Sequence, residues 1–139
     1  MNSMYLNYLF IACGGAAGAL SRYLVSTWVY NKFQGSFPLG TFAVNIIGCF
    51  LLGAFYTLSL EKSLISPQLR MMISVGFLGA FTTFSTFSLE TMNIIKENNI
   101  LIAFMNISLS IMFGLTAVWL GVSAVNFFAK QSERSVKDG

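Results

Sequence analysis

The sequence predicts an all-α membrane protein with four transmembrane helices, and its composition, its charge-free runs and one unusual segment support this prediction. Of its 139 residues, 55% are hydrophobic and only 9% are charged, and the mean hydropathy is +0.71. A soluble domain would carry about 25% charged residues. Charge-free runs cover residues 1–21, 33–60, 71–89 and 98–129, each near or above the roughly 18 residues of a spanning helix. The unusual segment, residues 76–88, predicts that the third helix is broken.

These runs set the expected boundaries. We expect a single transmembrane domain over residues 1–129, with helices over residues 5–30, 39–60, 68–95 and 100–128. A short polar tail should follow over residues 130–139. Its Lys130, Arg134 and Lys137 belong near lipid headgroups, so the formal net charge of +3 is no sign of nucleic-acid binding.

The first predicted helix combines small residues with one charge. Gly14 and Gly18 have the small-xxx-small spacing that brings helix backbones together, which predicts a packing face. Arg22 lies in the same helix. A charge inside the membrane is costly and indicates a functional site, but this side chain could instead reach the nearby interface. Both interpretations of Arg22 remain open from the sequence.

Polar side chains in the second and fourth predicted helices also have two interpretations. Asn45 could join helices by hydrogen bonds or contact a ligand. Asn106, Ser110 and Gly114 follow one another at four-residue intervals and therefore share one helix face. This face could pack through small residues or form a polar track for a permeant ion. A four-helix subunit has little interior volume, so a transport path would require a second copy.

The third predicted helix contains the unusual segment, residues 76–88. Its glycines loosen the backbone, and its Ser and Thr hydroxyls can replace lost backbone partners. Broken helices are tolerated where they are buried in protein or line a polar path, so the segment predicts ion or solute handling. Phe81, Phe84 and Phe87 should lie near one face. They could form a core or lipid-facing stripe, or their positive ring edges could stabilise an anion.

The residue types exclude most catalysis. The chain has no His and only five acidic residues, and it shows no nucleophile beside a base. We therefore expect that this protein is not an enzyme. Hydroxyls and the Asn45 amide can donate hydrogen bonds to an anion, whereas carbonyls freed by a helix break can coordinate a cation.

With these motifs, the chain resembles the small bacterial fluoride channels of the Fluc or CrcB family. The resemblance covers nearly the whole chain, and its motifs are Gly14-Gly15-x-x-Gly18 with Arg22, Gly40-Thr41 with Asn45, and Gly76-x-x-Gly79-x-x-Thr82-Thr83-Phe84-Ser85-Thr86-Phe87. It implies a multi-pass, fluoride-selective channel of the bacterial plasma membrane, which gives passive fluoride efflux and fluoride resistance. It also implies an antiparallel, dual-topology homodimer of four-helix subunits within membrane lipid.

The resemblance further implies roles for individual residues. Gly79 and Thr82 would bind a structural sodium ion through their backbone carbonyls, and Arg22 would line a vestibule. Gly114 lacks the hydroxyl that some members carry at the end of the polar track. The fluoride pore would be formed by Asn45, Phe84, Ser85, Thr86, Phe87, Asn106 and Ser110.

The distribution of charge leaves the orientation open. Helix count places Lys62, Arg70, Lys130, Arg134 and Lys137 on one side of the membrane and Arg22, Lys32 and Lys96 on the other. Dual insertion expects near balance, so the chain could instead prefer one orientation and pair with an oppositely oriented paralogue.

Two other functions are compatible with four small helices. A proton-coupled exporter of the four-helix dimeric type needs a titratable carboxylate deep in the membrane, and only Glu90 could serve. A structural helix bundle without transport is the third interpretation, although the predicted break disfavours it.

Overall fold

A computed structural model describes residues 3–61 and 65–137, and this part of the chain is helical apart from short connections. The elements are α1 (Ser3–Lys32), α2 (Leu39–Tyr56), η1 (Thr57–Glu61), α3 (Pro67–Arg70), η2 (Met71–Leu78), α4 (Gly79–Phe81), α5 (Phe84–Lys96) and α6 (Ile100–Lys137), of which η1 and η2 are π-helical. Four stretches are long and apolar enough to cross a membrane: Met4–Lys32, Leu39–Leu60, Pro67–Lys96 and Ile100–Gln131. The predicted all-helical fold with four spans is confirmed.

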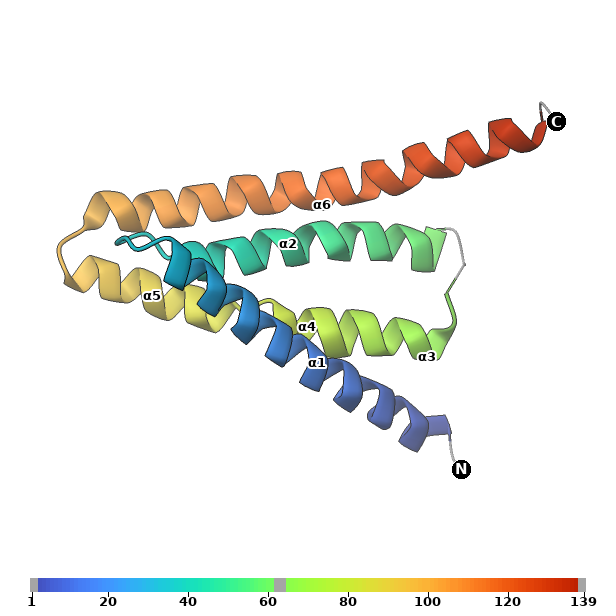
Figure 1. Ribbon diagram of the computed structural model, residues 1–139, viewed down its shortest axis with the longest axis horizontal. Coiled ribbons are helices and arrows are strands. Elements are labelled where there is room, and N and C mark those ends of the chain that lie inside the picture. The colour runs from blue at the N-terminus through green and yellow to red at the C-terminus, as the bar shows by residue number, and fades with distance from the viewer. Residues whose placement is uncertain (1–2, 62–64, 138–139) are drawn as a thin grey trace.

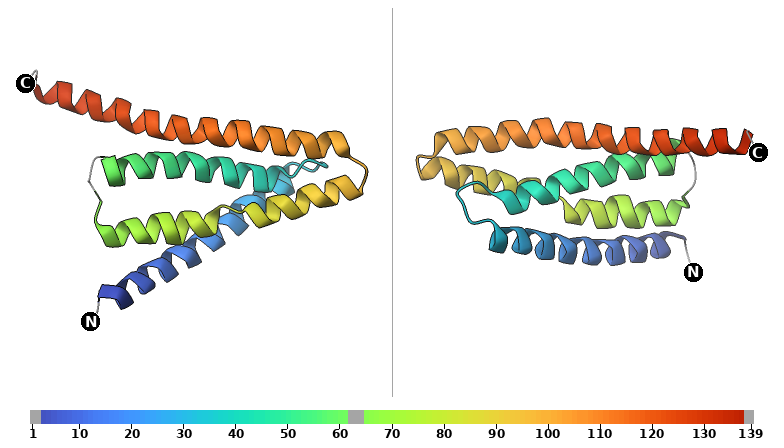
Figure 2. Two further views of the ribbon diagram at one scale, coloured as in Figure 1. Left: turned by 180° about the vertical axis from the view of Figure 1, so that it is seen from behind. Right: turned by 45° about the horizontal axis from the view of Figure 1, so that its top comes forward.

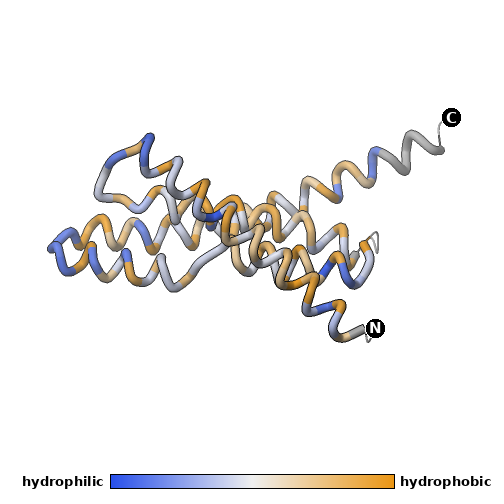
Figure 3. The backbone as a smooth tube through the Cα atoms, turned by 60° about the horizontal axis from the view of Figure 1, so that its bottom comes forward, coloured by the Kyte–Doolittle hydropathy of each residue, from blue (hydrophilic) through white to orange (hydrophobic). Residues whose placement is uncertain are grey.

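Successive spans run in opposite directions. The start of α1, the end of η1, the start of α3 and the end of α6 lie at one end of the bundle, and the connections after α1 and α5 lie at the other (Figure 1). Along its length α2 packs against α6, while α1 crosses the third span at η2 and α4 (Figure 2). Most of the middle of the bundle is hydrophobic (Figure 3), as expected for helices that face lipid.

Glycines allow the spans to approach closely. A Cβ added at Gly14 or Gly18 would collide with backbone carbonyls of η2, so the packing face predicted for the first helix is confirmed. Between α2 and α6, Gly53 and Gly121 have the same role, because a Cβ at either would collide with the facing backbone. Because the hydrophobic effect does not drive helices together within lipid, membrane helices associate through close packing at such small residues.

The fourth helix is longer than the sequence predicted. α6 continues through Lys137, whereas we expected it to end near residue 128, before a polar tail. The segment 122–137 contains neither Gly nor Pro, and most of residues 129–137 have good helix propensity. The change to a polar composition after residue 129 therefore does not end the helix.

We expect Gly18→Ala to destabilise the bundle, because the added methyl group would overlap the Phe77 carbonyl. Overpacking of this kind costs about 1–3 kcal/mol. Gly15→Ala is the matched control, since a Cβ there would lie 3.9 Å from its nearest neighbour, the Gly76 carbonyl oxygen. Thermal unfolding in detergent should show a lower midpoint for Gly18→Ala alone. Equal midpoints would contradict the close contact between α1 and η2.

Candidate functional site

Two extended residues separate α4 from α5 within the third span. α4 ends at Phe81 and α5 begins at Phe84. Between them, Thr82 has φ −80° and ψ 156°, and Thr83 has φ −149° and ψ 119°. Extended residues cannot continue the helical hydrogen-bond pattern, so the backbone groups around them need other partners in a medium without bulk water.

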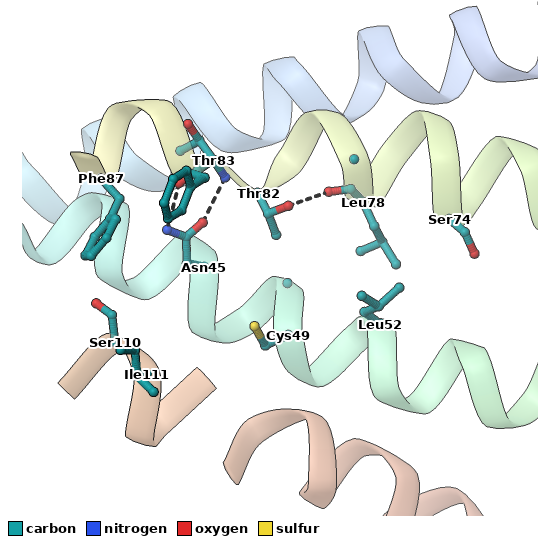
Figure 4. A pocket seen from close by; sticks show the side chains of 13 residues that line it. Asn45, Cys49, Leu52, Ser74, Leu78, Thr82, Thr83, Phe87, Ser110 and Ile111 are labelled. Carbon is teal, nitrogen blue, oxygen red and sulfur yellow. Dashed lines mark hydrogen bonds between the residues drawn. The ribbon is translucent and has the colours of Figure 1, made fainter. Parts of the chain in front are cut away.

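Asn45 on α2 supplies two of those partners. Its Nδ2 donates to the Thr83 carbonyl at 3.0 Å, and its Oδ1 accepts from the Thr83 amide at 2.9 Å (Figure 4). The side-chain amide thus replaces the hydrogen-bond partners that the Thr83 amide and carbonyl would have in a continuous helix. The sequence left open whether Asn45 joins helices or contacts a ligand, and the structure gives it the joining role. A ligand contact remains a prediction.

The same arrangement removes the usual donors from two backbone carbonyls. In an uninterrupted helix the Thr83 amide would donate to the Gly79 carbonyl, but here it donates to Asn45. Likewise, the Thr86 amide would donate to the Thr82 carbonyl, but it donates to the Thr83 Oγ1 at 3.2 Å. Because these donors are engaged elsewhere, the Gly79 and Thr82 carbonyl oxygens are left available for another partner. They are the two carbonyls that the resemblance assigned to sodium.

Hydroxyl groups cluster where α5 begins. Thr83 caps the helix, because its Oγ1 accepts from the Thr86 amide. The Thr83 hydroxyl also donates to Thr86 Oγ1 at 2.9 Å and lies 3.4 Å from Ser85 Oγ. The structure therefore brings Ser85 and Thr86, both predicted site residues, together at the helix start through Thr83.

A pocket of about 410 Å³, which we call the break pocket, lies beside the extended residues (Figure 4). It lies between the third span, α2 and α6, and none of its lining residues is charged. Of the predicted pore residues it contains Asn45, Phe84, Phe87 and Ser110. The full lining is Asn45, Gly48, Cys49, Leu52, Ser74, Leu78, Gly79, Thr82, Thr83, Phe84, Phe87, Ser110 and Ile111.

The phenylalanines do not share one face as predicted. Phe84 and Phe87 lie together with ring centroids 5.8 Å apart, and both line the break pocket. Phe81 is instead buried and stacks on Phe77 with centroids 5.7 Å apart. The prediction was wrong for Phe81 because the extended residues after it change the helical register. Of these three rings, only the two that follow the extended residues line the pocket.

The polar residues of α6 divide between two roles. Ser110 lines the break pocket. Asn106 is 1% exposed and donates to Thr91 Oγ1 at 2.8 Å, and Thr91 in turn donates to the Phe87 carbonyl at 2.7 Å. Asn106 is absent from the pocket lining and joins α6 to α5. Its position supports the backbone that carries Phe87.

A second pocket, of about 240 Å³, lies on the other side of Thr83 and contains Arg22. We call it the arginine pocket. It is lined by Ala19, Arg22, Tyr23, Ser26, Tyr30, Thr41, Val44, Thr83, Thr86 and Glu90. Thr83 belongs to both pockets. Thr83 therefore lies between the pocket that contains Arg22 and the uncharged pocket.

Sequence reasoning missed one polar cluster in the arginine pocket. Tyr30 Oη and Thr41 Oγ1 donate to the same oxygen of Glu90, at 2.7 and 2.9 Å. Gly40 lies under the Tyr30 ring, where a Cβ would collide with ring carbons. Gly40-Thr41 was the one part of this cluster that stood out in the sequence. Tyr30 and Glu90 are distant from this pair in the chain, and no sequence pattern connects them to it.

The fold and these pockets define a small multi-pass membrane protein with a polar site at non-helical backbone. The chain belongs to the CrcB family, because the family described as "CrcB-like protein, Camphor Resistance (CrcB)" matches residues 9–122. The resemblance drawn from its motifs is thereby confirmed.

Curated relatives in several bacteria are named fluoride-specific ion channel FluC. The protein of Geotalea uraniireducens (strain Rf4) is 51% identical over 114 residues, which are 82% of this chain and 92% of the relative. That of Geotalea daltonii (strain DSM 22248 / JCM 15807 / FRC-32) is 48% identical over 119 residues, 86% of this chain and 96% of the relative. A relative in Acidobacterium capsulatum is 43% identical over 121 residues, 87% of this chain and 97% of its own length.

We expect Asn45→Ala to lower the free energy of unfolding by about 1–3 kcal/mol, because it leaves the Thr83 amide and carbonyl without partners. Thr116→Val is the control, since it removes the hydroxyl bond that Thr116 makes to its own helix at the Met112 carbonyl. Thermal unfolding in detergent should separate the two variants. Equal midpoints would show that the Asn45 bonds do not stabilise the extended residues.

Proposed function

We propose that this chain is a subunit of a fluoride-selective channel, which lets fluoride leave the cytoplasm passively through the bacterial plasma membrane and so confers fluoride resistance. The observation that supports this best is the uncharged break pocket, where an amide, hydroxyls and two phenyl rings adjoin extended backbone. The relatives are named fluoride-specific ion channels, and an ion channel is not an enzyme, as the composition also predicted.

The pocket chemistry suits an anion that must both bind and leave. An amide nitrogen carries two donors, and Asn45 uses one on the Thr83 carbonyl. Ser110 adds a hydroxyl, and the rings of Phe84 and Phe87 can present their positive edges. These groups stabilise an anion without a full positive charge that would hold it too tightly.

Passive flow in this direction needs no coupled energy source. Hydrogen fluoride is a weak acid that enters cells as a neutral molecule and dissociates inside. A negative interior then favours anion exit by about 2.3 kcal/mol per 100 mV. A selective pore is therefore sufficient to lower cytoplasmic fluoride.

The alternative, a proton-coupled exporter, depends on Glu90, the one acidic residue within the four spans. Glu90 lines the arginine pocket and accepts two hydroxyl bonds on one oxygen. It is absent from the lining of the break pocket. The lining of the break pocket thus lacks the carboxylate that proton coupling would need, which favours the channel.

The channel is proposed to be an antiparallel homodimer whose subunits insert in both orientations, or a pair with an oppositely oriented paralogue. Phe84 supports a second copy: its ring lines the break pocket, yet it is 80% exposed on the single subunit. The start of α1 and the end of α6 lie at the same end of the bundle (Figure 1). Two identical subunits inserted in opposite orientations would therefore present the same pathway to both sides of the membrane.

A structural sodium ion is proposed at the carbonyls of Gly79 and Thr82. Their usual amide donors are engaged by Asn45 and by the Thr83 side chain, so both oxygens fit a cation ligand role. Among residues 4–60 and 65–131, whose side chains the structure describes, no group of acidic, Cys or His side chains could hold a metal instead. Two such carbonyls per subunit give four in a dimer, and bound sodium would offset the cost of bringing anions nearby.

We expect liposomes that contain the wild-type protein to release fluoride passively when valinomycin allows potassium to follow, with a rate unaffected by an imposed proton gradient. Phe84→Ile and Phe87→Ile keep apolar bulk but remove the ring edge. An edge contribution of about 0.5–1.5 kcal/mol corresponds to a flux that is about two- to tenfold slower. A fluoride electrode measures the release.

Phe128→Ile is the control, because Phe128 is 68% exposed near the end of α6 and outside both pockets. Wild-type flux in both pocket variants would refute the role of the ring edges. Flux that follows the proton gradient would favour the exporter, and no flux from the wild type would favour a structural bundle.

Replacing sodium completely by N-methyl-D-glucamine should abolish fluoride flux and shift the protein from dimer to monomer in size-exclusion chromatography. The reason is that four carbonyls without a cation would remain unpaired in an apolar medium. Restoring sodium should restore both properties. Full flux with an intact dimer in the organic cation would rule out the structural sodium.

A further inference from the structure

We infer that Tyr30 is a positioning residue that, together with Thr41, holds the Glu90 carboxylate away from the path of the anion. The inference rests on the proposed fluoride conduction and assigns a role to the polar cluster in the arginine pocket. Tyr30 Oη donates to Glu90 Oε1 at 2.7 Å, and Thr41 Oγ1 donates to the same oxygen at 2.9 Å. One carboxylate oxygen is therefore fixed from two different spans.

The phenol hydroxyl of Tyr30 is itself held in place. It lies 3.2 Å from Thr41 Oγ1 and accepts from the Thr41 amide at 3.4 Å. The ring lies against Gly40, where any side chain would collide with it. Gly40 thus provides room for the ring, and Thr41 provides the second hydroxyl. This accounts for both residues of the Gly40-Thr41 motif.

The carboxylate needs such restraint because of what shares its pocket. Arg22 lines the same pocket, and a positive charge there raises the local concentration of anions. A carboxylate free to turn could pair with Arg22 and cancel that charge, or it could repel the anion directly. Thr83 and Thr86 also line this pocket, so a freed carboxylate would be close to the break.

The second oxygen shows that the carboxylate is directed away from solvent. Glu90 Oε2 is buried, and it has no hydrogen-bond partner in the described part of the chain. An ionised carboxylate with one unpaired oxygen gains by reaching any available donor. The two hydroxyl bonds to Oε1 are therefore what opposes its movement toward Arg22.

The test measures fluoride efflux from liposomes for Tyr30→Phe with and without Glu90→Gln. Tyr30→Phe keeps the ring against Gly40 and removes one donor to the carboxylate. We expect its flux to fall roughly tenfold, the effect of one hydrogen bond to a charged group. Adding Glu90→Gln removes the negative charge and should restore most of the lost flux. Tyr8→Phe is the control, because Tyr8 is 59% exposed on α1 and outside both pockets.

Rescue by Glu90→Gln separates positioning from a structural role. If the Tyr30 hydroxyl only stabilised the fold, the double variant would conduct no better than Tyr30→Phe, and that result would overturn the inference. Wild-type flux in Tyr30→Phe would overturn it as well. Thr41→Val, which removes the other donor, should show the same loss and the same rescue, and it serves if Tyr30→Phe does not fold. No flux from the wild-type protein would instead refute the proposed function itself.

Discussion

Backbone amides and carbonyls that leave a helix inside a membrane need other partners, and the rest of this structure depends on how that requirement is met at Thr82 and Thr83. Asn45 on α2 bonds both the amide and the carbonyl of Thr83, whereas the Thr82 amide donates to the Leu78 carbonyl of its own span. These hydrogen bonds between Asn45 and Thr83 fix the position of α2 along the third span. The pockets, the rings and the freed carbonyls all lie around that point.

The two pockets on either side of Thr83 differ in their electrostatics. The arginine pocket contains a cation and a carboxylate, whereas the break pocket is lined by uncharged groups. A charged region attracts ions over a distance, and an uncharged region of hydroxyls, amides and ring edges binds them weakly. In the proposed channel, the anion would meet these two environments on either side of Thr83.

The parts of the fold that depend on local composition could be predicted from the sequence. Long apolar runs indicated the four spans, and the glycines and hydroxyls of residues 76–88 indicated irregular backbone. The partner of Asn45 could not be predicted, because its bonds reach residues that are distant in the chain. Tyr30 and Glu90 were missed for the same reason. The pattern of apolar residues also could not reveal the π-helical turns of η2, because almost every position in that segment is apolar.

The two bonds between Asn45 and Thr83 also restrict how this chain can change over generations. A variant that straightened the third span would no longer need the amide on α2, and Asn45 would then be left with unpaired polar atoms beside apolar helices. A variant that lost the amide first would expose the extended backbone instead. Either single step passes through a less stable protein, so substitutions of Asn45 and of the extended residues should be tolerated better in combination than alone.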